Sequence, residues 1–229
     1  MTLRAIFIYR WIVFLLAAGY VLRTLIFGDY SGFGGPFRYL TIWALCASFF
    51  SASRMMAIEE ERSENRWDGF VSMTAVINTM TVFLYWRLFF ADPSSVTQDG
   101  SLSAWHLELY LHGLGPLLQL IDALFIHRSF RKLGFAIAWL IGVIGAYALW
   151  VEFLVAPNTD TPVGTVTSGL PYPFLNNLEG SERVLFYGTN LVMALALLAI
   201  FAGISWIIRR QFQPLAMPEV QTDSQDKVA

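Results

Sequence analysis

Six apolar stretches, each long enough to cross a lipid bilayer, constrain the fold of this sequence most strongly. They cover about residues 6–27, 37–57, 70–91, 105–126, 133–155 and 184–208. A hydrocarbon core roughly 30 Å thick is crossed by about 20 residues of helix. In lipid only helices and closed barrels satisfy every backbone hydrogen bond, and these stretches lack the alternation of barrel strands. The sequence therefore predicts an all-α integral membrane protein with six transmembrane helices in one bundle.

One transmembrane domain over 1–210 accounts for these stretches, and the polar residues 211–229 are expected to form a disordered tail. The first stretch resembles a signal peptide up to Ala17-Ala18-Gly19. Its apolar run continues to Phe27, however, so we expect it to be kept as an anchor rather than cleaved.

Positive charge is distributed unevenly between the two sides of the predicted bundle, and cytoplasmic loops collect such residues. One side holds Arg4, Arg10, Arg54, Arg62, Arg66, Arg128, Arg131, Lys132, Arg209, Arg210 and Lys227, and the other Arg23, Arg38, Arg87 and Arg183. Both termini are therefore predicted to be cytoplasmic. We expect a multi-pass protein of the cell membrane whose active site faces the non-cytoplasmic side.

Several functional classes are disfavoured by composition. Cys46 is the only cysteine, which excludes a disulfide within the chain. Three histidines on two membrane faces suit neither a haem nor a zinc site, so no cofactor and no metal are expected. No basic stripe suggests nucleic acid, which leaves membrane lipids as the expected surroundings. The oligomeric state stays open.

A glycine turn and a proline precede the second apolar stretch in Gly34-Gly35-Pro36-Phe37-Arg38-Tyr39-Leu40-Thr41. Proline suits the first turn of a helix, so Pro36 is predicted to begin one, with Thr41 about one and a half turns in. The guanidinium of Arg38 could bind a carboxylate or an oxyanion. Extension of its side chain to anionic headgroups is slightly favoured over that role.

His112 lies about two turns into the fourth stretch, and Glu108, one turn earlier, could orient its ring. Pro116 cannot donate to the carbonyl of His112, so the helix is predicted to bend there. A neutral histidine bonded to another helix explains this residue equally well. A hydroxyl nucleophile needs a base within hydrogen-bonding reach. Thr41 and His112 could form such a pair if the second and fourth helices are neighbours.

Other polar residues have simpler explanations. Asn78 is expected to make an interhelical hydrogen bond rather than a substrate contact. His127 is expected to be exposed at the cytoplasmic end. Asp122 and Glu152 lie near the ends of their stretches, where each is expected to pair with an arginine or face water.

Four segments in order resemble the AIG1/ADTRP (FAR-17a) family of membrane threonine hydrolases. They are Gly34 to Thr41, Arg66-Trp67-Asp68 with Tyr85-Trp86, His112 with Pro116, and Pro171-Tyr172-Pro173-Phe174-Leu175. The resemblance implies a hydrolase of fatty acid esters of hydroxy fatty acids. It also implies Thr41 as nucleophile and His112 as base.

Candidate substrate-binding residues are Arg38, Asn78 and Tyr172, and a lipid ester or fatty acid is the expected partner. The chain departs from the family pattern at Leu109 and Leu170, which leaves the acyl length and the ester position open.

A non-enzymatic protein is the main alternative, either a lipid-binding protein or a small-solute carrier in which Thr41 and His112 make a binding or packing contact. Transporters more often show inverted repeats and broken helices, and apart from Pro116 the sequence shows neither. A scaffold or sensor subunit is a third possibility.

Overall fold

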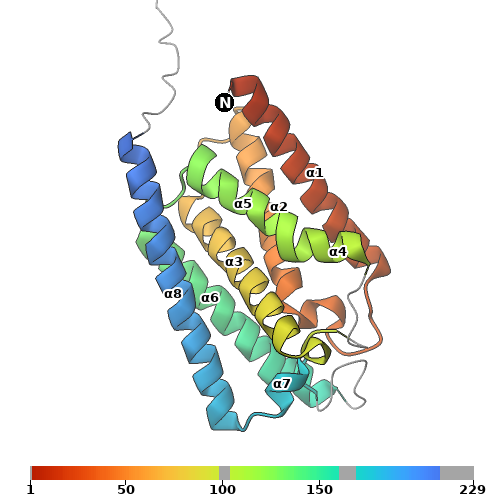
Figure 1. Cartoon of the computed structure of the whole chain (residues 1–229). Helices are drawn as coiled ribbons and strands as arrows, with labels where there is room; N and C mark the ends of the chain where they lie inside the picture. The colour runs from red at the N-terminus through yellow and green to blue at the C-terminus, as the bar shows by residue number, and fades with distance from the viewer. Residues whose placement is uncertain (1, 98–103, 160–168, 212–229) are drawn as a thin grey trace, which may run out of the picture.

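The computed structural model describes residues 2–97, 104–159 and 169–211, and in these parts every regular element is helical (Figure 1). Six helical segments are long and apolar enough to cross a membrane. They are Leu3–Phe27, Leu40–Glu59, Asp68–Ala91, Trp105–Ile126, Leu133–Asn158 and Gly180–Gln211. The prediction of an all-α fold with six such helices is confirmed, and the expected boundaries differ from the observed ones by a few residues.

Four of these segments are single α-helices: α1 (Leu3–Phe27), α2 (Leu40–Glu59), α3 (Asp68–Ala91) and α8 (Gly180–Gln211). The other two change helix type along their length, which brings extra turns of wider helix into the bundle. Their parts are α4 (Trp105–Leu109), η3 (Tyr110–Leu114), α5 (Gly115–Ile121), η4 (Asp122–Ile126), α6 (Leu133–Trp150), η5 (Val151–Val155) and η6 (Ala156–Asn158), of which η3, η4 and η5 are π turns. Three short helices lie in connections: η1 (Gly35–Arg38), η2 (Pro93–Ser95) and α7 (Pro173–Asn176).

Helix α3 is the central helix, and 67% of its most apolar window is buried, against 17% for α1. It packs on α2, α5, α6 and α8 (Figure 1). Small residues allow these close approaches. At Gly69, for example, an added Cβ would lie only 2.7 Å from the Cβ of Phe135 in α6.

The start of α1 and the end of α8 lie at the same end of the bundle, here called the terminal end (Figure 1). A chain that crosses a membrane an even number of times has both of its ends on the same side. The assignment of that end to the cytoplasm stays a prediction from the distribution of arginine and lysine. The predicted disordered tail after α8 lies outside the described residues.

Buried ion pairs hold the terminal end together. Arg10 of α1 contacts Glu59 at 2.7 Å and Asp122 at 3.2 Å, so it links three segments. Asp122 therefore pairs with an arginine, as expected, and Glu152 does the same with Arg183 at 3.0 Å.

The expectation that His127 is exposed was wrong, because this side chain is buried. Its Nε2 lies 3.0 Å from Asp68 Oδ1 and 2.8 Å from the carbonyl oxygen of Arg66. The Arg66 guanidinium in turn donates to the carbonyl of His127 at 2.6 Å. Burial of the ring is thus compensated by partners on another segment, which the local sequence does not reveal.

Candidate functional site

The turn before α2 uses both of its glycines in left-handed backbone conformation. Gly34 has φ +80° and Gly35 has φ +49°, and a Cβ on Gly35 would meet the ring of Tyr30 at 2.7 Å. Pro36 then lies in the single 3₁₀ turn η1. Helix α2 itself begins at Leu40 rather than at Pro36, because Tyr39 is extended, with φ −102° and ψ 132°. Thr41 is therefore in the first turn of α2, not one and a half turns in.

Aromatic side chains fix this turn by hydrogen bonds to its carbonyl groups. Tyr147 Oη donates to the carbonyl of Arg38 at 2.9 Å. The carbonyl of Phe37 accepts from both Trp43 Nε1 at 2.9 Å and Trp150 Nε1 at 3.1 Å. The position of the first turn of α2 is thus set by two segments, α2 itself and α6.

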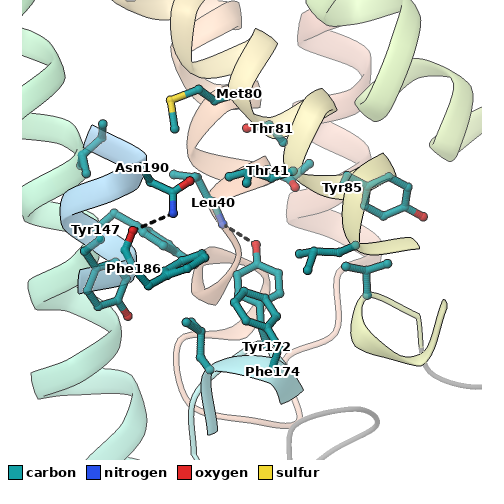
Figure 2. A pocket seen from close by; sticks show the side chains of 16 residues that line it. Leu40, Thr41, Met80, Thr81, Tyr85, Tyr147, Tyr172, Phe174, Phe186 and Asn190 are labelled. Carbon is teal, nitrogen blue, oxygen red and sulfur yellow. Dashed lines mark hydrogen bonds between the residues drawn. The ribbon is translucent and has the colours of Figure 1, made fainter. Parts of the chain in front are cut away.

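Tyr172, which precedes α7, supplies the acceptor that the start of α2 needs. Tyr39 gives α2 no side-chain cap, and the amide of Leu40 donates to Tyr172 Oη at 3.2 Å (Figure 2). The same phenol also interacts with the hydroxyls of Tyr147 and Thr41. Burial raises the pKa of Tyr172 to about 12, so the phenol stays protonated at neutral pH and can itself donate a hydrogen bond.

An apolar cavity lies against Thr41, and the centre of a water molecule can occupy about 90 Å³ of it. Its walls come from α2, α3, α6, α7, α8 and the turn after η2 (Figure 2). The lining residues are Leu40, Thr41, Met80, Thr81, Leu84, Tyr85, Leu88, Val96, Ile144, Tyr147, Tyr172, Phe174, Leu175, Phe186, Tyr187 and Asn190. We call this space the acyl cavity, because its walls are mostly hydrocarbon with a few hydroxyl groups.

A second, much smaller cavity lies on another side of Thr41, with about 10 Å³ open to the centre of a water molecule. Besides Thr41 it is lined by Leu45, Ser48, Asn78, Tyr110, Leu111, Gly115 and Pro116. We call it the small cavity. Asn78 Nδ2 donates to Ser48 Oγ of α2 and to its own helix at Thr74, both at 2.9 Å, which confirms the predicted interhelical hydrogen bond.

The predicted bend at His112 is confirmed. His112 lies inside the π turn η3 with non-helical φ −115° and ψ 20°. Its carbonyl, which Pro116 cannot reach with an amide, accepts instead from Trp86 Nε1 of α3 at 2.8 Å. The kink is therefore held open by a specific donor from the central helix.

The ring of His112 is buried and stacks on the ring of Tyr85, with centroids 3.6 Å apart and planes 3° from parallel. Its Nε2 lies 3.9 Å from Glu108 Oε2, so Glu108 faces the ring as expected. Nδ1 is buried without a hydrogen-bond partner in the described parts of the chain. The Glu108 carboxyl also interacts with the hydroxyl of Tyr85.

No hydrogen bond joins the Thr41 hydroxyl to the His112 ring within the described residues. Tyr85 connects their surroundings, because it lines the acyl cavity with Thr41 and stacks on His112. From the sequence, Tyr85-Trp86 was identified only as part of a segment that resembles the family. That resemblance was the available sequence signal for a role of Tyr85 in the site, and the neighbouring Trp86 bonds the His112 carbonyl.

All of these residues lie within the part of the chain that a family model matches. The chain belongs to the FAR-17a/AIG1-like protein family. The family model matches residues 5–205, which reaches into all six long helices and confirms the family suggested by the sequence motifs. No curated protein and no solved structure matches the chain.

In this FAR-17a/AIG1-like protein Arg38 lies apart from both cavities. Its guanidinium is buried and contacts Asp29 Oδ2 at 2.8 Å instead of extending to headgroups. Hydrogen bonds from Ser31 hold the pKa of Asp29 below its usual value, which keeps this partner ionised. The geometry thus assigns Arg38 to the turn before α2, whereas Asn78 lines the small cavity and Tyr172 the acyl cavity.

Proposed function

We propose that this FAR-17a/AIG1-like protein is an intramembrane hydrolase of lipid esters, with Thr41 as nucleophile and His112 as base. The observation that carries the proposal is the place of Thr41, in the first turn of α2 and in the wall of the acyl cavity. Fatty acid esters of hydroxy fatty acids are the proposed substrates. We place the site toward the non-cytoplasmic face of the cell membrane, since it lies away from the terminal end.

The acyl cavity suits one alkyl chain of such an ester. Its walls are mostly leucine, isoleucine, valine, methionine and aromatic side chains, and the hydroxyl of Tyr172 interacts with that of Thr41. A chain that comes from the bilayer is already out of water, so close packing of its methylene groups against these walls, and not removal from water, would hold it. The ester carbonyl would then lie beside the hydroxyl of Thr41, where the wall of the cavity is polar.

An oxyanion can be stabilised at the start of α2, where unpaired amides and the helix dipole favour negative charge. The amide of Leu40 donates to Tyr172, and that of Ile42 donates to the carbonyl of Tyr39. The amide of Thr41 has no acceptor among the described residues, so it is available to a ligand. The protonated phenol of Tyr172 is the second candidate donor.

The surroundings of His112 suit its ring to accept a proton from Thr41. A carboxyl group facing Nε2 favours the tautomer with its proton there, which leaves Nδ1 as the acceptor. In the proposed reaction the Thr41 hydroxyl loses its proton to His112 as its oxygen bonds to the ester carbon. The ester C–O bond breaks, the departing alcohol takes that proton, and an acyl-threonine remains. Water then hydrolyses the acyl-threonine, giving the free fatty acid and the original threonine.

A covalent hydrolase probe tests this assignment directly. A fluorophosphonate should label the wild-type protein and the Thr41→Ser variant but not Thr41→Ala, and ester cleavage should fall by about 10³-fold or more in Thr41→Ala. Thr79→Ala is the matched control, because the Thr79 hydroxyl bonds its own helix at Ala75 and lines neither cavity.

Full ester cleavage by a folded Thr41→Ala protein would refute the assignment. A wild-type protein that binds the ester, is not labelled and does not cleave it would support the lipid-binding alternative. The observation that favours this alternative is that no hydrogen bond joins Thr41 to His112 within the described residues.

A further inference from the structure

Thr41 forms part of the wall of both cavities, which differ in size and chemistry. The acyl cavity has mostly hydrocarbon walls, whereas Thr41, Ser48 and Asn78 place three polar side chains around the small cavity. A cavity holds a water molecule when it offers about 10–15 Å³ to the centre of that molecule and two to four polar partners. The small cavity, at about 10 Å³, has room for one water and no more.

Asn78 is held in one orientation within this cavity. Its hydrogen bonds within the described residues are both made by Nδ2, one to Ser48 Oγ and one to the carbonyl of Thr74. No donor within the described parts of the chain bonds Asn78 Oδ1, so this oxygen is left as an acceptor. Ser48 Oγ donates to the carbonyl of Ala44 and accepts from Asn78, which leaves it one further lone pair.

The far wall of the small cavity is the turn that carries the proposed base. Tyr110, Leu111 and Gly115, on either side of His112, line it together with Pro116. A water molecule bound there would lie between the Thr41 hydroxyl and the π turn of His112. This position matters because no hydrogen bond links these two residues directly.

We infer that the small cavity is the binding site for the hydrolytic water, with Asn78 as its positioning residue. The inference rests on the proposed function, since it concerns the second half of that reaction. While an acyl chain fills the acyl cavity, water has no room on that side of Thr41. A separate polar cavity supplies water to the acyl-threonine without admitting it to the hydrocarbon.

In this step the oxygen of the bound water bonds to the acyl carbon while its proton passes to His112. The bond between that carbon and Thr41 Oγ then breaks. The threonine oxygen recovers the proton from His112, and the fatty acid leaves. One hydrogen of the water bonds to Asn78 Oδ1, and the other is the proton that passes to His112. Ser48 Oγ, which accepts from Asn78 and donates to Ala44, holds the amide in this orientation, so neither side chain exchanges a proton with the water.

Rapid mixing with a p-nitrophenyl fatty acyl ester separates the two halves of the reaction. Asn78→Leu removes the polar group at nearly constant volume. In this variant we expect the first turnover to keep its rate and amplitude, while steady-state turnover falls by about tenfold or more because the water is no longer oriented. Intact-mass measurement should show the acyl adduct accumulating, and peptide mapping should assign it to Thr41. Ser48→Ala should show the same split with a smaller fall, and its helix tolerates alanine.

Thr79→Ala serves again as control and should leave both phases unchanged. An equal fall of the first turnover and the steady state in Asn78→Leu and in Ser48→Ala would overturn the inference, as would unchanged steady-state turnover in both variants. A wild-type protein that forms no acyl adduct on Thr41 would remove the proposed function itself. Failure of the proposed function can be told apart from failure of the inference, because it is seen in the wild-type protein alone.

Discussion

His112 and His127 are two buried histidines, each with a carboxylate nearby, and they lie in different surroundings. His127 has Asp68 at 3.0 Å and the carbonyl of Arg66 at 2.8 Å. His112 has Glu108 at the longer distance of 3.9 Å, an aromatic ring on its face, and an Nδ1 without a partner in the described chain. A histidine held by a close carboxylate and a hydrogen bond stabilises the fold, whereas one with a buried acceptor that lacks a partner can take part in chemistry.

The same contrast separates the two ends of the bundle. At the terminal end, full charges meet in buried pairs such as Arg10 with Glu59 and Asp122. At the Thr41 end, phenol and indole groups bond the carbonyls of the turn before α2, as Tyr147 does with Arg38. The ion pair of that turn, Arg38 with Asp29, differs from those of the terminal end because its carboxylate is exposed. These neutral donors position the first turn of α2 without adding a charge beside Thr41, where we propose that the ester carbonyl binds.

Replacing each of the two histidines by alanine, one at a time, should give the largest effect and tests the comparison between them. His112→Ala should lower ester cleavage by roughly 10²–10⁴-fold, the usual contribution of a general base, and should change thermal stability little. His127→Ala should keep cleavage for each folded molecule and lower the free energy of unfolding by about 1–3 kcal/mol, because Asp68 loses a partner. Activity and thermal unfolding in the same detergent measure both. The comparison fails if cleavage is lost with His127 and kept with His112.

Removal of the arginine that links three helices should have the next largest effect. Arg10→Ala leaves the buried Asp122 and the half-buried Glu59 without this cation, which costs about 3–5 kcal/mol of unfolding free energy. Cleavage by the folded fraction should persist, since this pair lies at the terminal end. Arg4→Ala, an exposed arginine on the same helix, is the control and should change stability by less than about 0.5 kcal/mol. A loss of cleavage in Arg10→Ala without a loss of stability would contradict the division between the ends.

Local sequence predicted the elements of the site better than their partners. The glycine turn and the bend at His112 depend on the conformational limits of single residues, so they could be predicted without neighbours. The same holds for the six long helices, which depend on length and hydropathy. The start of α2 was predicted wrongly at Pro36, because the extended backbone of Tyr39 ends the turn of Pro36 before α2 begins.

Contacts between helices were predicted poorly, because they depend on how each helix is rotated about its axis. The chain gives no clear apolar stripe to fix that rotation, since membrane helices are apolar on most faces. The stacking of Tyr85 on His112 and the burial of His127 against Asp68 therefore became visible only in the structure. The contact of Arg38 with Asp29 was not predicted either, because its partner lies in the loop nine residues earlier, whose conformation the sequence pattern did not indicate.

The smallest expected effect concerns the neutral hydrogen bonds of the Thr41 end. Tyr172→Phe removes the oxygen that accepts from Leu40 and interacts with Thr41. Loss of this cap should cost about 1 kcal/mol of unfolding free energy, as loss of an N-cap does. We expect ester cleavage to fall by about tenfold, since Thr41 loses a fixed neighbour and the oxyanion loses a candidate donor.

Tyr39→Phe is the matched control for this change. The ring of Tyr39 packs edge-on against Tyr172, with centroids 5.7 Å apart, and its hydroxyl bonds no other residue in the described chain. Its loss should alter neither stability nor cleavage. If Tyr172→Phe lowers stability and leaves the rate of the first turnover intact, the phenol only caps α2. In that case the neutral hydrogen bonds of the Thr41 end only stabilise the fold, as the ion pairs of the terminal end do.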